Sequence, residues 1–176
     1  IGANTRSDLS NLASRGDKDG VEAYGILYHT NGNRELRVED VSDRLAVEPN
    51  KHVLRCDICR TPNGVSVTFA VAQAMQENME QAGKLIAFDV HSHGAYGIKF
   101  LGGSGALVKD NLGLKNLSDP SDSDLKGSTL SSVRGFQTSA ISTNNGYRIY
   151  STKVDGTGRY VNTGNIYDVN GNLQKK

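Results

Sequence analysis

Two histidines separated by one residue are the first feature of this chain that could carry chemistry. His91 and His93 flank Ser92 at the end of the mostly apolar run at residues 85–90. Side chains alternate between the faces of a strand, so both imidazoles would project from one face, about 7 Å apart along the backbone. Imidazole is a common zinc ligand, so the spacing predicts a metal site at the end of a buried strand.

A catalytic zinc ion typically has three protein ligands and one open position, which leaves one ligand to find. Ser121 and Asp124 lie three positions apart at a predicted helix start, on one side of its first turn. We expect Asp124 to be the third ligand and Ser121 to face the bound water or the substrate. Asp110, Asp119 and Asp122 remain alternatives, but none of them has a serine three positions earlier.

Each of these motifs also has a plainer explanation. A His-x-His pair in a strand is more often a surface feature, and Ser-x-x-Asp is more often a helix cap. The combination favours a functional site, because two polar rings at the end of a buried strand cost free energy unless they have partners.

The elements that must position these residues can be predicted from periodicity and turn signals. Residues 22–29 and 35–38 are β-prone around Asn31-Gly32, which indicates a hairpin with Glu22 at its entrance. A second hairpin is predicted for residues 139–151 around Asn144-Asn145-Gly146. Residues 7–20 are expected to form a short helix followed by a charged loop.

The segment before the histidines combines a helix and a strand. Apolar residues recur at helical spacing over residues 66–82, with Ser66 as the expected cap and Gly83 as the terminator. The next strand would contain Ile86, Phe88 and Val90 on the face opposite the histidines, packed against that helix. Residues 52–60 also alternate in polarity and predict a strand.

Length and composition indicate one loop-rich domain. The chain has 176 residues, 20 of them glycine. We expect a domain core at about residues 20–151, a long irregular insertion at residues 94–120 that forms a lid or is disordered, and an irregular tail at residues 152–176. Cys56 and Cys59 are too few for a disulfide framework, and a buried or disulfide-bonded pair is favoured over a metal site.

Charge and hydropathy exclude two classes of partner. The formal net charge is +1 and no run of five basic residues occurs, so neither nucleic acid nor an anionic membrane is an expected partner. No apolar stretch approaches the roughly 18 residues of a spanning helix. Because the chain begins at Ile1 rather than Met, we expect a piece processed from a longer protein.

In its spacing of motifs, the chain resembles the JAMM metalloproteases, whose fold is called the MPN or JAB domain. The family signature is an upstream Glu, then His-x-His, then Ser-x-x-Asp, which correspond here to Glu22, His91 and His93, and Ser121 and Asp124. The pattern Glu-x-x-Gly at residues 22–25 also matches, and the resemblance covers about residues 20–151. The gap between His93 and Ser121 is longer than is usual in the family.

The resemblance implies an α+β fold with a central mixed β-sheet flanked by helices, and a zinc-dependent peptidase or isopeptidase activity. His91, His93 and Asp124 would hold Zn²⁺, and Glu22 would act as general base on the metal-bound water. Ser121 would donate a hydrogen bond to the oxyanion. The substrate would be a protein, with ubiquitin-like or target-cell proteins as candidates.

The expected biological setting comes from a looser similarity. The glycine- and asparagine-rich tail at residues 167–173 resembles the carboxy-terminal toxin domains of bacterial polymorphic toxins of the Rhs type. Such a domain would be secreted or delivered into the cytoplasm of a target cell and neutralised by a cognate immunity protein. The alternative is a catalytically inactive MPN-type module that binds proteins without turnover.

Overall fold

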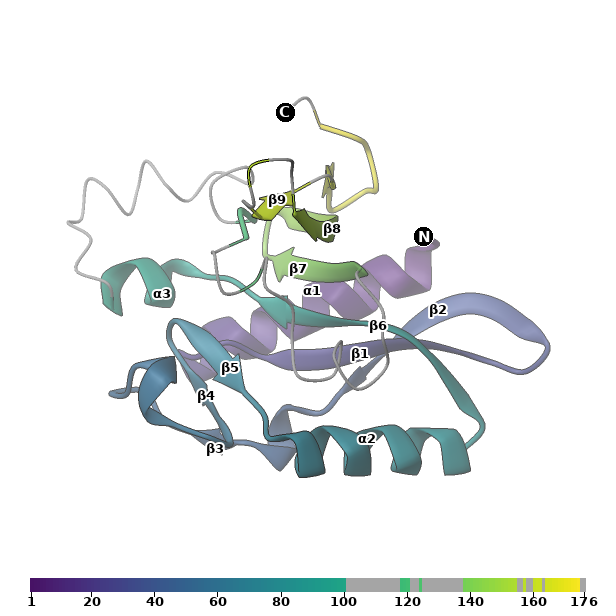
Figure 1. The fold of residues 1–176 in the computed structure, drawn as a ribbon. Coiled ribbons are helices and arrows are strands. Elements are labelled where there is room, and N and C mark those ends of the chain that lie inside the picture. The colour runs from purple at the N-terminus through teal and green to yellow at the C-terminus, as the bar shows by residue number, and fades with distance from the viewer. Residues whose placement is uncertain are drawn as a thin grey trace.

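The computed structural model describes residues 1–100, 118–120, 124, 138–154, 157, 160–162 and 164–174. Within these residues a mixed β-sheet is flanked by helices in one α+β domain, which confirms the predicted fold class (Figure 1). The strand order in this sheet is β10-β8-β7-β6-β1-β2, with β9 beside β8. Its strands are β1 (Tyr24–Thr30), β2 (Asn33–Asp40), β6 (Lys84–Ser92), β7 (Thr138–Thr143), β8 (Gly146–Val154), β9 (Tyr160–Asn162) and β10 (Asn165–Asp168).

The pairing of β6 with β7 is parallel, whereas the other described pairs of this sheet are antiparallel. Parallel neighbours need a long crossover connection, and here that connection runs through residues 93–137. The predicted insertion is therefore part of a crossover that begins just after Ser92. Because the crossover starts at the end of β6 that carries the histidines, its residues can contribute to a site there.

Both predicted hairpins are confirmed, as β1 with β2 and β7 with β8. The tail is less irregular than predicted, because β8 extends to Val154 and is followed by β9 and β10. The expected loop at residues 94–120 begins with a helix, α3 (Ala95–Phe100), and residues 101–117 lie outside the described part of the chain. The helix expected after Ser121 also lies outside it, apart from the helical residue Asp124.

The first helix is longer than predicted. α1 (Ala3–Asp19) continues through the segment expected to be a charged loop and ends at Gly20, which has a left-handed φ of 70°. Its buried positions Leu9, Leu12, Ala13 and Gly16 follow helical spacing, so Gly16 completes the apolar stripe. Packing against the sheet therefore outweighs the poor helix propensity of Gly16.

The second helix, α2 (Phe69–Gln81), confirms the predicted helix but not its cap. Thr68, rather than Ser66, accepts a hydrogen bond from the Val71 backbone N–H (3.4 Å). Ser66 cannot serve as the cap because it is paired with Cys59 at the end of β5 (Gly64–Ser66). Gly83 follows the helix with a φ of 76°, in agreement with its expected role as terminator.

A bulge in β6 changes which helix covers the strand. The register between β1 and β6 shifts between Leu27 and Tyr28, which pair with Phe88 and Ile86 and leave Ala87 unpaired. As a result Ile86 packs with the core cluster that contains Met75 and Met79 of α2. Phe88 and Val90 pack instead with the core cluster that contains Leu9 and Leu12 of α1. The prediction that all three apolar residues pack against α2 was wrong, because regular alternation cannot reveal a bulge.

The strand predicted at residues 52–60 was also wrong for most of its length. It contains a short 3₁₀ turn, η2 (Val53–Arg55), and then β4 (Cys59–Thr61), the centre of a small sheet with β3 (Ala46–Val47) and β5. His52 Nδ1 accepts the Leu54 N–H and the Asn63 side chain accepts the Val53 N–H. These local bonds replace strand pairing.

A disulfide and a further short turn complete the description of the elements. Cys56 and Cys59 form a disulfide, as favoured from the sequence. A further 3₁₀ turn, η1 (Ser42–Arg44), follows β2. Across the described ranges of the chain, every helix falls short of the length and apolar character that crossing a bilayer requires.

The contact between α1 and β6 gives a stability test. A Cβ added at Gly16 would lie 2.3 Å from Ser92 Oγ and 2.8 Å from Tyr96 Oη. Gly16→Ala should therefore lower the free energy of unfolding by about 1–3 kcal/mol, although alanine is the better helix former. Urea denaturation measures the change. Ser14→Ala, on the exposed face of α1, is the control and should be near neutral; equal stability of the two variants would contradict the close approach.

Candidate metal centre

The pairing of β1 with β6 brings Glu22 beside the two histidines. Tyr24 pairs with His91, and the Ser92 N–H donates to the Ala23 carbonyl (3.0 Å). Two residues further out in this register, Glu22 faces His93. The His93 N–H donates to Ser142 O (3.0 Å), so the backbone is held on the β1 side at Ser92 and by β7 at His93.

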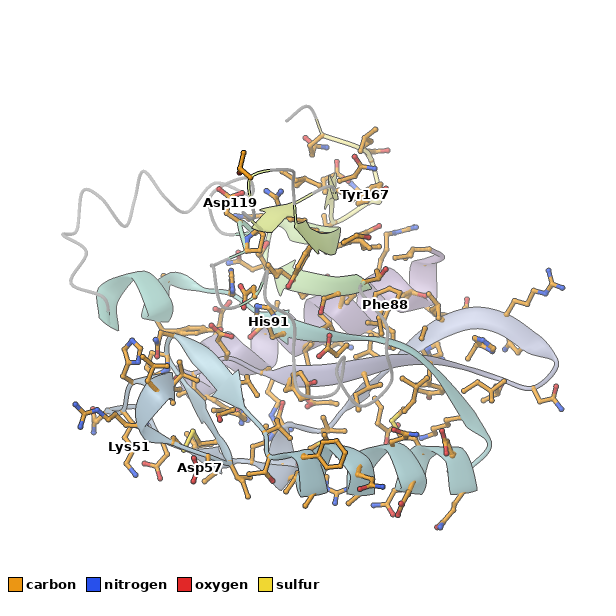
Figure 2. The ribbon with its side chains drawn as sticks, in the orientation of Figure 1. Lys51, Asp57, Phe88, His91, Asp119 and Tyr167 are labelled. Atoms are coloured by element: carbon orange, nitrogen blue, oxygen red, sulfur yellow. A yellow bond between two sulfur atoms is a disulfide. The ribbon has the colours of Figure 1, made fainter. Side chains whose placement is uncertain are left out.

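Glu22 and the two histidines form a candidate metal-binding group. Their ligand atoms all lie within 4.8 Å of one another. His91 Nε2 and His93 Nε2 are 3.0 Å apart, and Glu22 Oε2 is 3.9 Å from His93 Nε2. The three side chains are only 8–18% exposed, so the group is largely shielded from bulk water. Figure 2 shows His91 on β6, close to the centre of the fold.

Asp124 reaches the same point from the crossover. Its Oδ2 lies 3.2 Å from His91 Nε2 and 3.4 Å from His93 Nε2, and its side chain is 17% exposed. The structure thus brings together Glu22, His91, His93 and Asp124. It does so although the connection from His93 to Asp124 is unusually long for the family that the chain resembles.

The other residues predicted for the site are not seen beside the histidines. Asp119 is 55% exposed and pairs with Arg148 Nη2 at 2.6 Å, so this rival for the third ligand is engaged elsewhere. Ser121 and the rivals Asp110 and Asp122 lie outside the described residues. The pair between Asp119 and Arg148 ties the chain just before Asp124 to β8, which sequence reasoning did not foresee.

The donor atoms fit a tetrahedral metal ion. Zinc binds imidazole nitrogen and carboxylate oxygen at about 2.0–2.2 Å, so tetrahedral ligands lie about 3.3 Å from one another. His91 Nε2, His93 Nε2 and Asp124 Oδ2 are separated by 3.0, 3.2 and 3.4 Å. This triangle matches one face of the tetrahedron, and Glu22 lies beside it.

Burial makes the Glu22 carboxyl an unusually weak acid. Removal from water raises the pKa of its carboxyl to about 8; the positive charge of His93 opposes this rise and Asp124 adds to it. Without a cation, the neutral form of Glu22 is therefore favoured near pH 7. A positive charge held beside the carboxyl would lower its pKa and return it to the ionised form that a general base requires.

Asp124 and the histidines shift in the opposite direction from what burial alone would cause. Burial raises the pKa of Asp124, but the charge and hydrogen bonds of the two histidines hold it well below its ordinary value. Burial lowers the pKa of His91 and of His93, but Asp124, joined by Asp89 at His91 and by Glu22 at His93, more than offsets this, so both values are raised. A metal ion would therefore have to displace protons from the histidines.

A buried polar network lies on the same face of β6, and sequence reasoning missed it. Asp89 is 2% exposed and accepts hydrogen bonds from Tyr24 Oη (2.6 Å) and from Ser139 Oγ. Asp89, His91 and His93 alternate along the strand, so period-two spacing could have revealed the first of them. The negative charge of Asp89 also contributes to the raised pKa of His91.

Comparison with protein-family models and with curated protein sequences gives no match to this chain. The resemblance to JAMM metalloproteases therefore remains a prediction that depends on the residues themselves.

Ligand replacement tests the metal centre directly. His91→Ala and His93→Ala should each reduce zinc binding by at least about 100-fold, because each removes one corner of the donor triangle. Glu22→Gln should retain zinc, since Glu22 lies outside the triangle. Competition with a chromophoric chelator gives the affinities. Zinc still bound in stoichiometric amount after both histidines are replaced would disprove the assignment.

The raised pKa of Glu22 predicts how stability changes with pH in the metal-free protein. The folded pKa of about 8 exceeds the ordinary value of 4.5, so ionising Glu22 opposes folding increasingly as pH rises from about 4.5 to 8. Metal-free Glu22→Gln should be more stable than wild type at pH 7.5, by on the order of 1–3 kcal/mol. This advantage should shrink toward pH 4.5. Urea denaturation in the presence of a chelator provides the comparison. A stability advantage of Glu22→Gln that grew at low pH would contradict the raised pKa of Glu22.

Proposed function

We propose that the chain is a zinc-dependent peptidase or isopeptidase of the JAMM type. The observation that carries the proposal is the triangle of donor atoms from His91, His93 and Asp124, with the buried carboxyl of Glu22 at its edge. A structural zinc site needs no such neighbouring carboxyl, whereas hydrolysis needs a base at this place.

The proposed reaction is addition of water across an amide bond. His91, His93 and Asp124 would hold Zn²⁺, which would supply Lewis acidity at the substrate carbonyl and lower the pKa of water to about 7. Glu22 accepts a proton from the attacking water and delivers it to the leaving nitrogen, so hydroxyl adds to the carbonyl carbon as the C–N bond breaks. Ser121 is proposed to donate a hydrogen bond to the developing oxyanion.

An inactive MPN-type binding module is the competing function. It would retain the fold but would not need Glu22 to be buried next to the histidines, with only 6% of the residue exposed. Burial of an ionisable carboxyl costs free energy, and a module without turnover gains nothing from that cost. This is the observation that favours the enzyme.

Hydrolysis by matched variants tests the proposal. The zinc-loaded chain should cleave isopeptide-linked ubiquitin or a peptide library, and a chelator should abolish cleavage, with recovery on adding zinc. Glu22→Gln should lower kcat by at least about 100-fold while zinc content stays unchanged, because only the base is lost. Mass spectrometry of the products gives the bond cleaved. Equal rates for Glu22→Gln and wild type would rule out this role.

We also propose that the domain acts as a delivered bacterial toxin, on the basis of its tail. Expression of the wild type in the cytoplasm of a bacterial host should then slow growth, and expression of Glu22→Gln should not. Proteins cleaved only in cells with the wild type would identify the substrate. Equal growth of the two strains, with activity intact in vitro, would reject the toxin role and retain the enzyme.

A further inference from the structure

Arg60 is the largest of the almost completely buried side chains among the described residues. Only 1% of it is exposed, although it carries a charge that is costly to remove from water. It lies in β4, which sequence reasoning did not connect with the site. The cost of burying a guanidinium is offset only when its donors are bonded, so the partners of Arg60 show what it holds in place.

The Arg60 guanidinium bonds to two residues where the chain passes from the end of α1 toward β1. Its Nε donates to the Glu22 carbonyl oxygen (2.9 Å), and its Nη2 donates to Asp19 Oδ2 (2.7 Å). Between these residues the chain reverses at Gly20, whose φ is 70°. One guanidinium thus bridges the end of the helix and the residue that carries the proposed base.

The other backbone group of Glu22 is held by the same strand. The Glu22 N–H donates to the Thr61 carbonyl oxygen (3.0 Å). Glu22 precedes β1, which begins at Tyr24, so the ladder of the main sheet does not hold it directly. Its backbone carbonyl and N–H are instead fixed by Arg60 and Thr61, neighbours in β4.

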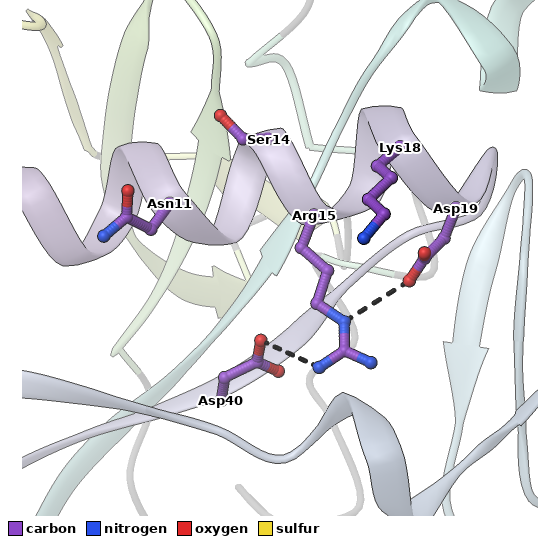
Figure 3. A pocket seen from close by; sticks show the side chains of 6 residues that line it. All are labelled: Asn11, Ser14, Arg15, Lys18, Asp19 and Asp40. Carbon is purple, nitrogen blue, oxygen red and sulfur yellow. Dashed lines mark hydrogen bonds and ion pairs between the residues drawn. The ribbon is translucent and has the colours of Figure 1, made fainter.

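The acidic partner of Arg60 is itself anchored at the surface. Asp19 also accepts from Arg15 Nε (3.3 Å), and Arg15 Nη1 reaches Asp40 (3.3 Å). Figure 3 shows these bonds at a hollow of about 440 Å³ on α1. Burial raises the pKa of Asp19, but the bonds from Arg60 and Arg15 lower it below its ordinary value, so the carboxylate stays charged.

We propose that Arg60 is a positioning residue for the general base. Arg60 fixes the backbone of Glu22 so that the Glu22 carboxyl is aimed at the metal ligands. This inference depends on the proposed function. The fork of arginine serves two acceptors in different directions, whereas the ammonium of lysine is a single point donor. Lysine at position 60 would keep the charge and lose the geometry.

Variants of the bridge test this role. Zinc-loaded Arg60→Lys and Asp19→Asn should each lower kcat by about 10- to 100-fold, because small displacements of a reacting group have effects of this size. KM and zinc affinity should stay within about twofold of wild type, because neither residue bonds to His91, His93 or Asp124. Asp19 is partly exposed, so Asp19→Asn tests the bridge even where Arg60→Lys unfolds.

Arg37→Lys is the matched control. Arg37 also holds α1 to a strand through a two-pronged pair with an aspartate, Asp8, at 2.7 and 3.1 Å, but it does not contact Glu22. It should leave kcat unchanged. A fall in kcat equal to that of Arg60→Lys would show that any weakened packing of α1 is sufficient, and would overturn the proposal.

A double variant separates positioning from general destabilisation. If Arg60 acts through the carboxyl of Glu22, adding Arg60→Lys to Glu22→Gln should not lower the residual rate further. A further tenfold loss would overturn the inference. Wild-type kcat in both Arg60→Lys and Asp19→Asn would do the same.

Hydrogen exchange provides a measurement that does not need activity. Amides of residues 19–24 in the zinc-loaded protein should exchange faster in Arg60→Lys and in Asp19→Asn, but not in Arg37→Lys. If the wild type hydrolyses no substrate, the proposed function fails while this result still tests whether Arg60 holds Glu22. Unchanged exchange in both bridge variants would reject the placement.

Discussion

The register of β1 against β6 is the constraint on which the site depends. With Tyr24 opposite His91, Glu22 comes to lie beside His93, and Asp89 lies on the same face one position earlier in the alternation. A shift by a single residue would turn the carboxyl of Glu22 to the side of the sheet packed by α1. The bulge at Ala87 sets this register, since the pairing before it and the pairing after it differ by one residue.

The charged groups of the site are held together with little exposure to water. The side chains of Glu22, His91, His93 and Asp124 are largely buried. The pKa of the Glu22 carboxyl is raised, whereas the pKa of the Asp124 carboxyl is lowered. This division follows from the contacts, because Asp124 touches both histidines and Glu22 touches only one of them, at a longer distance. The same environment would therefore distinguish the proposed ligand Asp124 from the proposed base Glu22.

The sequence was sufficient for the parts of the fold with local signals. Both hairpins follow from Asn-Gly turns, and α2 follows from its spacing of apolar residues. The histidines could be found because alternation along β6 is regular near its end. The structure also brings Asp124 to them, although spacing alone left Asp110, Asp119 and Asp122 as alternatives.

The rest could not be predicted because it depends on contacts between distant segments. Nothing local marks the bulge at Ala87 or the helical course of residues 16–19, which packing against Ser92 stabilises. The alternation at residues 52–60 was misleading because side chains of His52 and Asn63 satisfy the backbone there. Nothing local marks Arg60 as buried, since its partners lie about forty positions earlier.

The parallel pairing of β6 with β7 has a consequence for how the chain folds. The pairing of β6 with β7 must wait until the connection through residues 93–137 has closed, and contacts between such distant residues form slowly. During this interval one edge of β6 would be open to pairing with another chain. A metal ion joining Asp124 to His91 and His93 would divide the connection into two shorter loops, so its arrival would favour completion of the sheet over aggregation.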